Sequence, residues 1–239
     1  MRMQWPMQSR MQRTGFRRRR ALHALMLAAG LAAGAAQAQQ AAARVAVPLY
    51  DPGHVAVGLA RHWSLPLSAA FDGSAQALAP TLQALCEAAP AQAQARLEAA
   101  RSAWTRAVGD WELYASVPLG ALIERRSQRE IDFTPTRPEL IARAIERGPR
   151  NAADMERVGT PAKGLPALEW LLWTRPAAPG APACGYAVQV AAEVAREAAA
   201  LHAAAQATAR ELPEQEAGGA AFGELLNQWV GAVERLRWQ

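Results

Sequence analysis

The spacing of apolar residues constrains this chain more than any other feature. Apolar side chains recur every three to four residues, as at Leu78, Leu82 and Leu85 or at Tyr186 and Val190. No segment alternates apolar and polar residues as a half-buried strand does. The chain is also rich in alanine and leucine, which are good helix formers. The sequence therefore predicts an all-α fold, built as a helical bundle.

The same spacing predicts the individual helices and their buried sides. Helices are expected over residues 52–63, 69–88, 91–114, 139–147, 166–173, 186–212 and 216–236, with an interruption at Pro66 and a less regular zone over 117–163. The last helix is expected to turn these apolar residues toward the core: Phe222, Leu225, Leu226, Trp229, Val233 and Leu236. Core packing is also the preferred interpretation of four tryptophans: Trp104, Trp111, Trp170 and Trp173.

The N-terminal segment has the pattern of a secretory signal peptide. Seven arginines and no acidic residue lie within residues 2–20, and a short apolar run over 21–36 leads to a small-x-small triplet that ends at Ala38. The run is too short and too rich in alanine for a membrane-spanning helix. We therefore expect a signal peptide over 1–38, cleaved near Ala38, and a periplasmic protein without a transmembrane segment in its mature chain. Export by the general or the twin-arginine route stays open.

The basic character of the chain belongs to this segment. Without its seven arginines, the 26 basic residues fall to 19 against 21 acidic residues, a net charge of −2 for the mature part. A nucleic-acid-binding protein needs clustered lysine and arginine on its folded surface. The mature sequence has no such cluster, and nucleic acid is not expected as a partner.

The mature chain is long enough for one large domain or two small ones. We divide the sequence into the signal peptide, a leader with a first helix over 39–68, and a helical domain over 69–239. The chain has two cysteines, Cys86 and Cys184. An even number of cysteines in an oxidising compartment predicts a disulfide, with two buried free thiols as the alternative.

The most distinctive segment runs from Lys163 to Trp173. It contains Gly164 and Glu169, followed by Trp170 and a Leu-Leu pair. This segment resembles the signature region of the imelysin-like family of bacterial envelope proteins, whose motif is Gly-x-His-x-x-Glu followed by an aromatic residue and Leu-Leu. That family includes proposed metallopeptidases and proteins associated with iron uptake.

Upstream landmarks of the same family occur in the same order. They are Trp104-x-Arg106, Trp111-Glu112, Leu119-Gly120 and Ile131-Asp132-Phe133-x-Pro135. The resemblance is specific over about 100–175 and extends over about 70–236. It implies a helical architecture of two bundle-like halves, with the motif near their junction.

Pro166 is the main departure from the family pattern, because it stands where the motif has histidine. A histidine and a glutamate three residues apart lie on one face of a helix, where both can bind one ion. Proline has no side-chain donor atom. We therefore expect no catalytic residue here, and a metal site that is incomplete or rebuilt around Glu169.

The resemblance offers two further carboxylates as metal ligands, Glu112 and Asp132. Together with Glu169 they would form an all-carboxylate site, which suits iron or another divalent cation. In the alternative interpretation, Glu169 lies in the first turn of a helix and interacts with its dipole, while the other two pair with Arg106 or nearby arginines. The histidines of the mature chain are interpreted as surface, boundary or structural residues: His54, His62 and His202.

The resemblance and the signal peptide together favour a periplasmic protein of metal or iron acquisition, acting as a binding or accessory component. Its expected partners are iron-uptake or other envelope components. One alternative is a zinc-type metallopeptidase, and another is an envelope interaction scaffold without ligand chemistry. The sequence contains no nucleotide-binding loop, no Cys-x-x-Cys pair and no recognisable nucleophile with a histidine base.

Overall fold

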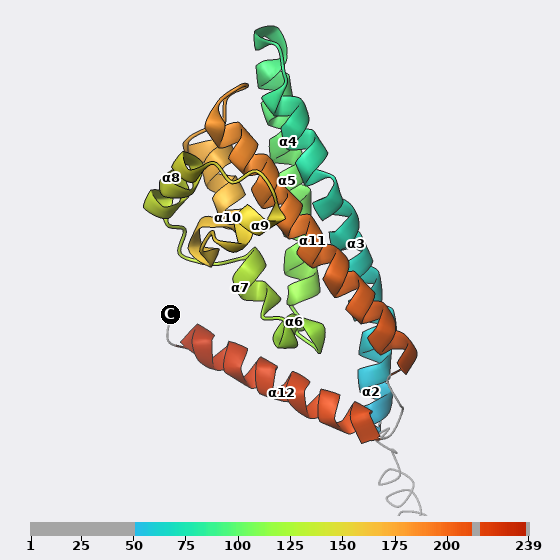
Figure 1. Ribbon diagram of the computed structural model, residues 1–239. Coiled ribbons are helices and arrows are strands. Elements are labelled where there is room, and N and C mark those ends of the chain that lie inside the picture. Colours follow the sequence, from blue (N-terminus) through green and yellow to red (C-terminus); the bar gives the residue numbers. More distant parts are fainter. Residues whose placement is uncertain (1–50, 212–215, 238–239) are drawn as a thin grey trace, which may run out of the picture. The chain divides into compact units, whose positions relative to one another are not determined.

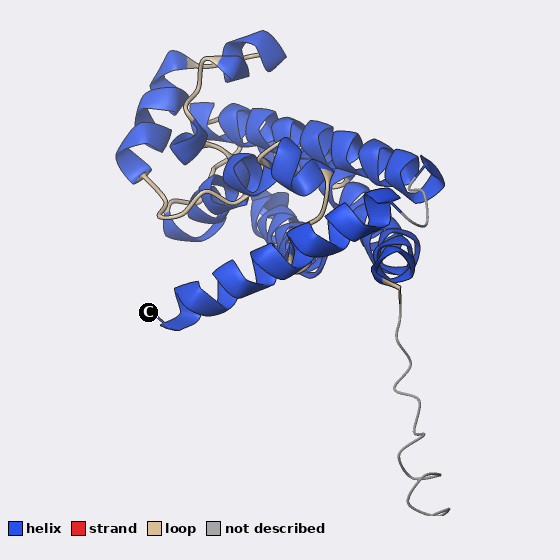
Figure 2. Cartoon of the chain, turned by 90° about the horizontal axis from the view of Figure 1, so that it is seen from below, coloured by secondary structure: helices blue, strands red, loops and turns tan. Residues whose placement is uncertain are grey.

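The computed structural model describes residues 51–211 and 216–237. These residues form helices joined by turns, and they contain no strand, as Figure 2 shows. Contacts divide the chain into Met1–Leu49 and Tyr50–Gln239, and every described helix belongs to the second unit. The prediction of an all-α fold is confirmed. The predicted signal peptide over 1–38 lies outside the described residues.

The helices follow one another along the chain with short connections (Figure 1). In order they are α2 (Pro52–Leu59), the π-helical turn η1 (Ala60–Ser64), α3 (Leu65–Gln76), α4 (Leu78–Cys86), the 3₁₀ turn η2 (Pro90–Gln92), α5 (Ala93–Ala115), α6 (Ala121–Glu124), α7 (Ser127–Ile131), α8 (Pro138–Arg147), α9 (Ala152–Glu156), the 3₁₀ turn η3 (Thr160–Ala162), α10 (Gly164–Glu169), the π-helical turn η4 (Trp170–Thr174), α11 (Pro182–Glu211) and α12 (Glu216–Arg237).

The core lies where α11 packs along α3 and α4, with α5 packed against the same two helices. The predicted apolar side of α11 is buried: Tyr186, Val190, Val194, Leu201 and Ala205 are each at most 6% exposed. Phe71 of α3 contacts Trp111 of α5 with ring centroids 5.2 Å apart. The short helices α7 to α10 lie beside α11, and α10 contacts both α11 and α5.

The structure differs from the predicted helix boundaries at two prolines. The chain stays helical through Pro66, because the turn just before it is π-helical and the Leu65 N–H bonds to the Ala60 carbonyl. A proline cannot donate to the carbonyl four residues earlier, and a wider turn accommodates the missing bond. Conversely, the predicted helix over 69–88 breaks at Ala77, so that Pro80 falls in the first turn of α4, where its missing N–H costs little.

The two cysteines form the predicted disulfide. Cys86 is the last residue of α4, and Cys184 lies in the first turn of α11. Their Cα atoms are 5.5 Å apart, and 98 positions separate them in the sequence. The bond therefore fixes one end of the longest helix to the helix on which it packs.

Helix α12 corrects the prediction for the last helix. Leu225 is 2% exposed, but Leu226, Trp229 and Val233 are 44%, 49% and 66% exposed. The expectation that these three residues face the core is wrong. Helical spacing identifies an apolar side but does not say whether another element covers it, and the main contacts of α12 are with α2. No helix in the described part of the chain is long and apolar enough to cross a membrane.

Candidate functional site

The motif segment begins at a close contact between two backbones. Gly164 has a φ of +78°, and a Cβ atom built on it would lie 2.3 Å from the carbonyl oxygen of Ile131. Any side chain there would be strained in conformation and would overlap that carbonyl. The glycine therefore lets the start of α10 touch the end of α7, which joins two landmarks that are 33 positions apart.

Two side chains of α5 bind the backbone of the same segment. The Trp104 indole N–H donates to the Leu165 carbonyl at 2.9 Å. Arg101 donates twice to the Leu172 carbonyl, at 3.0 Å from Nε and 2.8 Å from Nη2. Its guanidinium also lies over the Trp173 ring, 5.4 Å from the centroid. These bonds hold both ends of the motif segment against the core.

The tryptophans divide between core and surface. Trp111 is 2% exposed, Trp104 and Trp170 are half-buried, and Trp173 is 41% exposed. Trp173 packs edge-on against Trp104 with centroids 4.9 Å apart. The prediction of core packing is therefore confirmed for Trp111, partly confirmed for Trp104 and Trp170, and wrong for Trp173.

Positions 166 and 169, which correspond to the histidine and glutamate of the family motif, differ in burial. Pro166 is buried, together with Leu165 and Leu168, whereas Glu169 is exposed. Glu169 is the last residue of α10, and no acidic residue lies in the first turn of that helix. The interpretation of Glu169 as a first-turn residue that interacts favourably with the helix dipole is therefore wrong, because α10 already begins at Gly164 and Glu169 lies beyond its first turn.

The other two candidate ligands lie on separate elements. Glu112 is exposed on α5, and Asp132 is a half-buried residue at the end of α7. Among the described residues, no group of three or more histidine, cysteine, aspartate or glutamate side chains could hold a metal ion. The structure thus does not gather Glu112, Asp132 and Glu169 into one site. None of the three forms an ion pair within residues 51–211 and 216–237.

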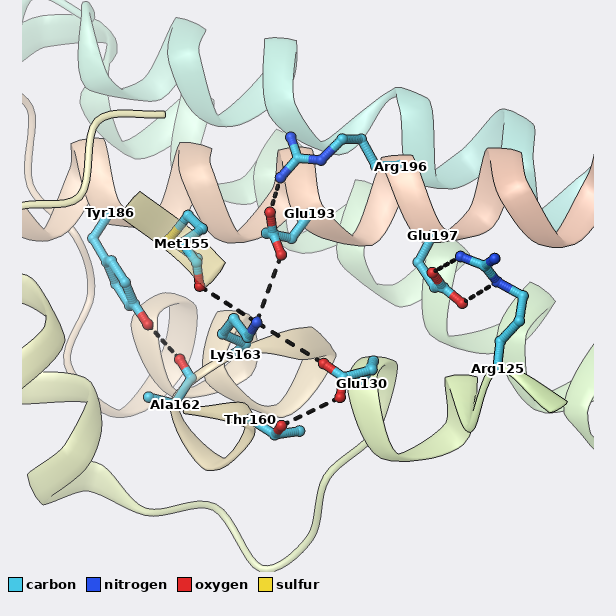
Figure 3. Close-up of polar contacts among 10 residues, drawn as sticks. All are labelled: Arg125, Glu130, Met155, Thr160, Ala162, Lys163, Tyr186, Glu193, Arg196 and Glu197. Atoms are coloured by element: carbon cyan, nitrogen blue, oxygen red, sulfur yellow. Dashed lines mark hydrogen bonds and ion pairs between the residues drawn. The ribbon is translucent and has the colours of Figure 1, made fainter. Parts of the chain in front are cut away.

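A cluster of charged side chains lies around Lys163, the residue that precedes Gly164 in the sequence (Figure 3). Its pocket of about 190 Å³ is lined by Arg125, Glu130, Ile131, Lys163, Glu193, Val194, Arg196 and Glu197. The Lys163 side chain is only 11% exposed. Its Nζ lies 3.6 Å from a Glu193 oxygen, 3.9 Å from a Glu130 oxygen and 3.5 Å from the Met155 carbonyl. Lys163 thus connects α7, α9 and α11 at the residue before Gly164.

The remaining charges of the cluster are also paired. Arg125 donates to both oxygens of Glu197, at 2.9 and 2.6 Å, and this hydrogen bonding raises the pKa of Arg125. The buried Ser127 hydroxyl donates to Glu197 at 2.6 Å, and Arg196 pairs with Glu193. Three cations therefore meet three carboxylates. A metal ion would have to displace these cations, so the arrangement suits a structural connection between helices.

Sequence reasoning missed this cluster, although part of its signal is visible. Glu193, Arg196 and Glu197 follow one another at helical spacing on α11. Their partners come from α6, α7 and the motif segment, and no local pattern connects those segments to α11. Tyr186 of α11 adds a bond from its hydroxyl to the Ala162 carbonyl, and burial raises the pKa of this tyrosine.

The match to a family supports the sequence landmarks. The model of the Imelysin peptidase family matches residues 65–238. The chain belongs to the imelysin family. A solved imelysin-like protein from Psychrobacter arcticum 273-4 has a similar fold, with a TM-score of 0.59 at 17% identity. The similarity covers 72% of this chain and 56% of that protein, so the chain spans little more than half of it. No curated protein sequence matches significantly.

The three described histidines of this imelysin-family chain do not replace the one missing from the motif. His54 and His62 are exposed. His202 is half-buried, and its Nδ1 lies 3.0 Å from the hydroxyl of Ser68, which itself donates to the Leu65 carbonyl at 2.8 Å. That bond makes His202 Nδ1 the donor, and Nε2 then accepts from Gln206 at 2.8 Å. Since the Ser68 hydroxyl donates elsewhere, His202 is not placed as its base.

Proposed function

We propose that this chain is an exported imelysin-family protein that serves metal or iron acquisition in the periplasm as an accessory component, and not as a peptidase. The observation that argues against a peptidase is the contrast between positions 166 and 169. The first is a buried proline, and the second is an exposed glutamate at the end of the same short helix. The motif segment here serves as a packed connection between α5, α7 and α11.

The chemistry of metallopeptidases gives this contrast its weight. A catalytic zinc site commonly has three protein ligands and a fourth position for water, and hydrolysis also needs a base to activate that water. Here one motif position has no donor atom, and the described residues offer no group of three ligands around the other. The charged cluster beside the motif has its carboxylates paired with cations, which leaves them poorly placed as ligands.

Two observations support export to the periplasm. The N-terminal sequence has the three regions of a secretory signal peptide. The Cys86–Cys184 disulfide is of the kind that forms and persists in oxidising compartments. The metal or iron role rests on the family resemblance, since that family includes proteins associated with iron uptake.

A growth experiment tests the cellular role. The gene is deleted in its own organism, and growth is compared in iron-limited and iron-replete media. We expect slower growth only under iron limitation, restored by the full chain but not by a chain that lacks residues 1–38. Growth at the wild-type rate after deletion would contradict the acquisition role. Equal rescue by the chain without the N-terminal segment would contradict periplasmic action.

Metal analysis of the purified mature protein separates binding from accessory action. Metal content is measured by mass spectrometry for the native protein and for Glu169→Ala, both from iron-replete cells. Background metal in both supports an accessory role without direct binding. Near-stoichiometric iron in the native protein that Glu169→Ala loses supports direct binding by Glu169, the glutamate of the motif.

Proteolysis assays test the peptidase alternative. The native protein and Pro166→His are incubated with unfolded protein substrates, with and without a chelator. We expect no chelator-sensitive cleavage by the native protein. Cleavage by the native chain that stops with chelator would overturn the non-peptidase assignment, whereas cleavage by Pro166→His alone would support the proline as the reason for its absence.

A further inference from the structure

A second and larger pocket lies apart from the motif. It has a volume of about 380 Å³ and is lined by residues of α2, η1, α5, α6, α11 and α12 and of the segment before α6. None of its lining residues comes from the motif segment 163–173 or from the charged cluster. Seven of the 13 lining residues are alanine or glycine. The absence of large side chains on several helices at once accounts for the space.

Close packing between α2 and α12 positions one wall of this pocket. Gly218 of α12 lies against Gly53 of α2, and a Cβ atom on Gly218 would be 2.4 Å from the Gly53 Cα atom. The two helices can therefore approach this closely only because residue 218 has no side chain. This contact places Ala220, Ala221 and Glu224 of α12 along the pocket.

The charged side chains that line the pocket are all negative. Glu124 and Glu224 line it, and no lysine, arginine or histidine does. Neither carboxylate forms an ion pair with another described residue. Glu224 accepts a hydrogen bond from Gln228 at 2.7 Å, which leaves its charge uncompensated. This differs from the charged cluster beside the motif, where every carboxylate has a cation.

The hydroxyl groups of Ser64, Tyr114 and Thr208 complete the polar lining. The side chains of the other lining residues are apolar or absent, so the pocket combines an apolar wall with a few polar groups. Helical bundles commonly bind small molecules in pockets of this size and composition. The apolar wall suits a hydrocarbon body, and the two carboxylates suit a positively charged head.

We propose that this pocket binds a small organic amine, with its apolar body against the alanine-lined wall and its ammonium group near Glu124 and Glu224. This is a binding site in addition to the proposed accessory role, and it does not depend on metal or on the motif. A neutral molecule of the same shape gains only the apolar contact. An anion of the same shape is repelled by both carboxylates.

Three probes with one body and different heads test the charge preference. 2-Phenylethylamine, 2-phenylethanol and 3-phenylpropionate are titrated into the purified mature protein at neutral pH by calorimetry, and the site is located by amide chemical shifts. We expect the amine to bind at least tenfold more tightly than the alcohol, with no detectable binding of the carboxylate. Equal binding of amine and alcohol, or no binding of the amine, would overturn the proposal.

Matched variants locate the site. Ala205→Leu places a larger side chain in the pocket from α11, and Ala209→Leu makes the same change one turn later, at a position that is equally buried but does not line the pocket. We expect at least a tenfold loss of amine affinity in the first and less than a twofold change in the second. Equal losses in both variants would contradict binding at this pocket.

Charge variants keep the proposal testable if Ala205→Leu does not fold. Glu124→Gln combined with Glu224→Gln preserves the shape of the pocket and removes its charge. We expect the preference for amine over alcohol to fall below threefold, while Glu234→Gln, an exposed change elsewhere on α12, leaves it intact. An unchanged preference in the double variant would overturn the assignment of the two carboxylates. Since metal content and growth are not involved, failure here leaves the proposed function standing.

Discussion

Gly164 decides the local structure of the motif by having no side chain. Its φ of +78° and its contact with the Ile131 carbonyl tie the motif segment to the end of α7. Two positions later, Pro166 is buried in the same connection. The sequence identified both residues as landmarks, but it could not show that Gly164 allows packing against α7 or that Pro166 is buried.

Replacing Gly164 with alanine should be strongly destabilising. The new Cβ atom would overlap the Ile131 carbonyl in a backbone conformation that alanine rarely adopts, and we expect a loss of about 3 kcal/mol or more in the free energy of unfolding. Gly109→Ala is the matched control. Gly109 lies inside α5 with open space around it, so alanine should stabilise by about 0.5–1 kcal/mol. Urea denaturation measures both, and similar effects of the two changes would contradict the close contact.

Tyr114 should make the fold sensitive to alkaline pH. Burial raises its pKa from the ordinary 10.0 to about 12, the charge of Glu197 adds to the rise, and a hydrogen bond with Ser64 partly opposes it. A pKa that is higher in the folded state means that the stabilisation is complete below pH 10 and is lost as the pH rises through 12. The loss should be about 2–3 kcal/mol. Denaturation at pH 9 to 12 measures it, and Tyr114→Phe should show a smaller decrease.

At the scale of elements, the disulfide and the charged cluster join helices that are distant in the sequence. The disulfide connects α4 to the start of α11, and the cluster connects α6, α7 and the motif segment to its middle. The even cysteine count, together with the expected export to an oxidising compartment, predicted the first connection over two free thiols. The second could not be predicted, because each charged residue is unremarkable in its own helix and the pairs form only when the helices pack.

Removing the disulfide should lower stability without changing the fold. The bond closes a long loop in the unfolded chain, so its loss should cost about 2–4 kcal/mol. The measurement is urea denaturation of the native protein with and without reductant. A variant that combines Cys86→Ala and Cys184→Ala should have the lower stability in both conditions. A native protein whose midpoint is indifferent to reductant would contradict this expectation.

At the scale of the whole described unit, α12 shows how little helical spacing says about burial. Leu225 and Val233 both belong to the predicted apolar side, yet their exposed fractions are 2% and 66%. The difference arises because only part of α12 lies against other helices. The close contact between Gly53 and Gly218 holds the covered part of α12 against α2, and no sequence pattern predicts this contact.

Substitutions along α12 should separate its covered and uncovered residues. Leu225→Ala removes a buried side chain and should cost about 2–4 kcal/mol in the free energy of unfolding. Val233→Lys should stay within about 0.5 kcal/mol, because that side chain is largely in water. Thermal and urea denaturation of the two variants test this. A large loss from Val233→Lys would mean that another surface covers this side of the helix.

The sequence by itself determined the helical class, most helix positions, the disulfide and the family, because these depend on local spacing, on cysteine number and on the order of landmarks. Only the tertiary structure decided which carboxylates meet, where Glu169 and Pro166 lie, and which side of α12 is covered. These properties depend on contacts between helices that are far apart in the sequence. A hydrogen bond, an ion pair or a pocket between helices forms only where they pack, and the residue spacing within one helix does not predict it.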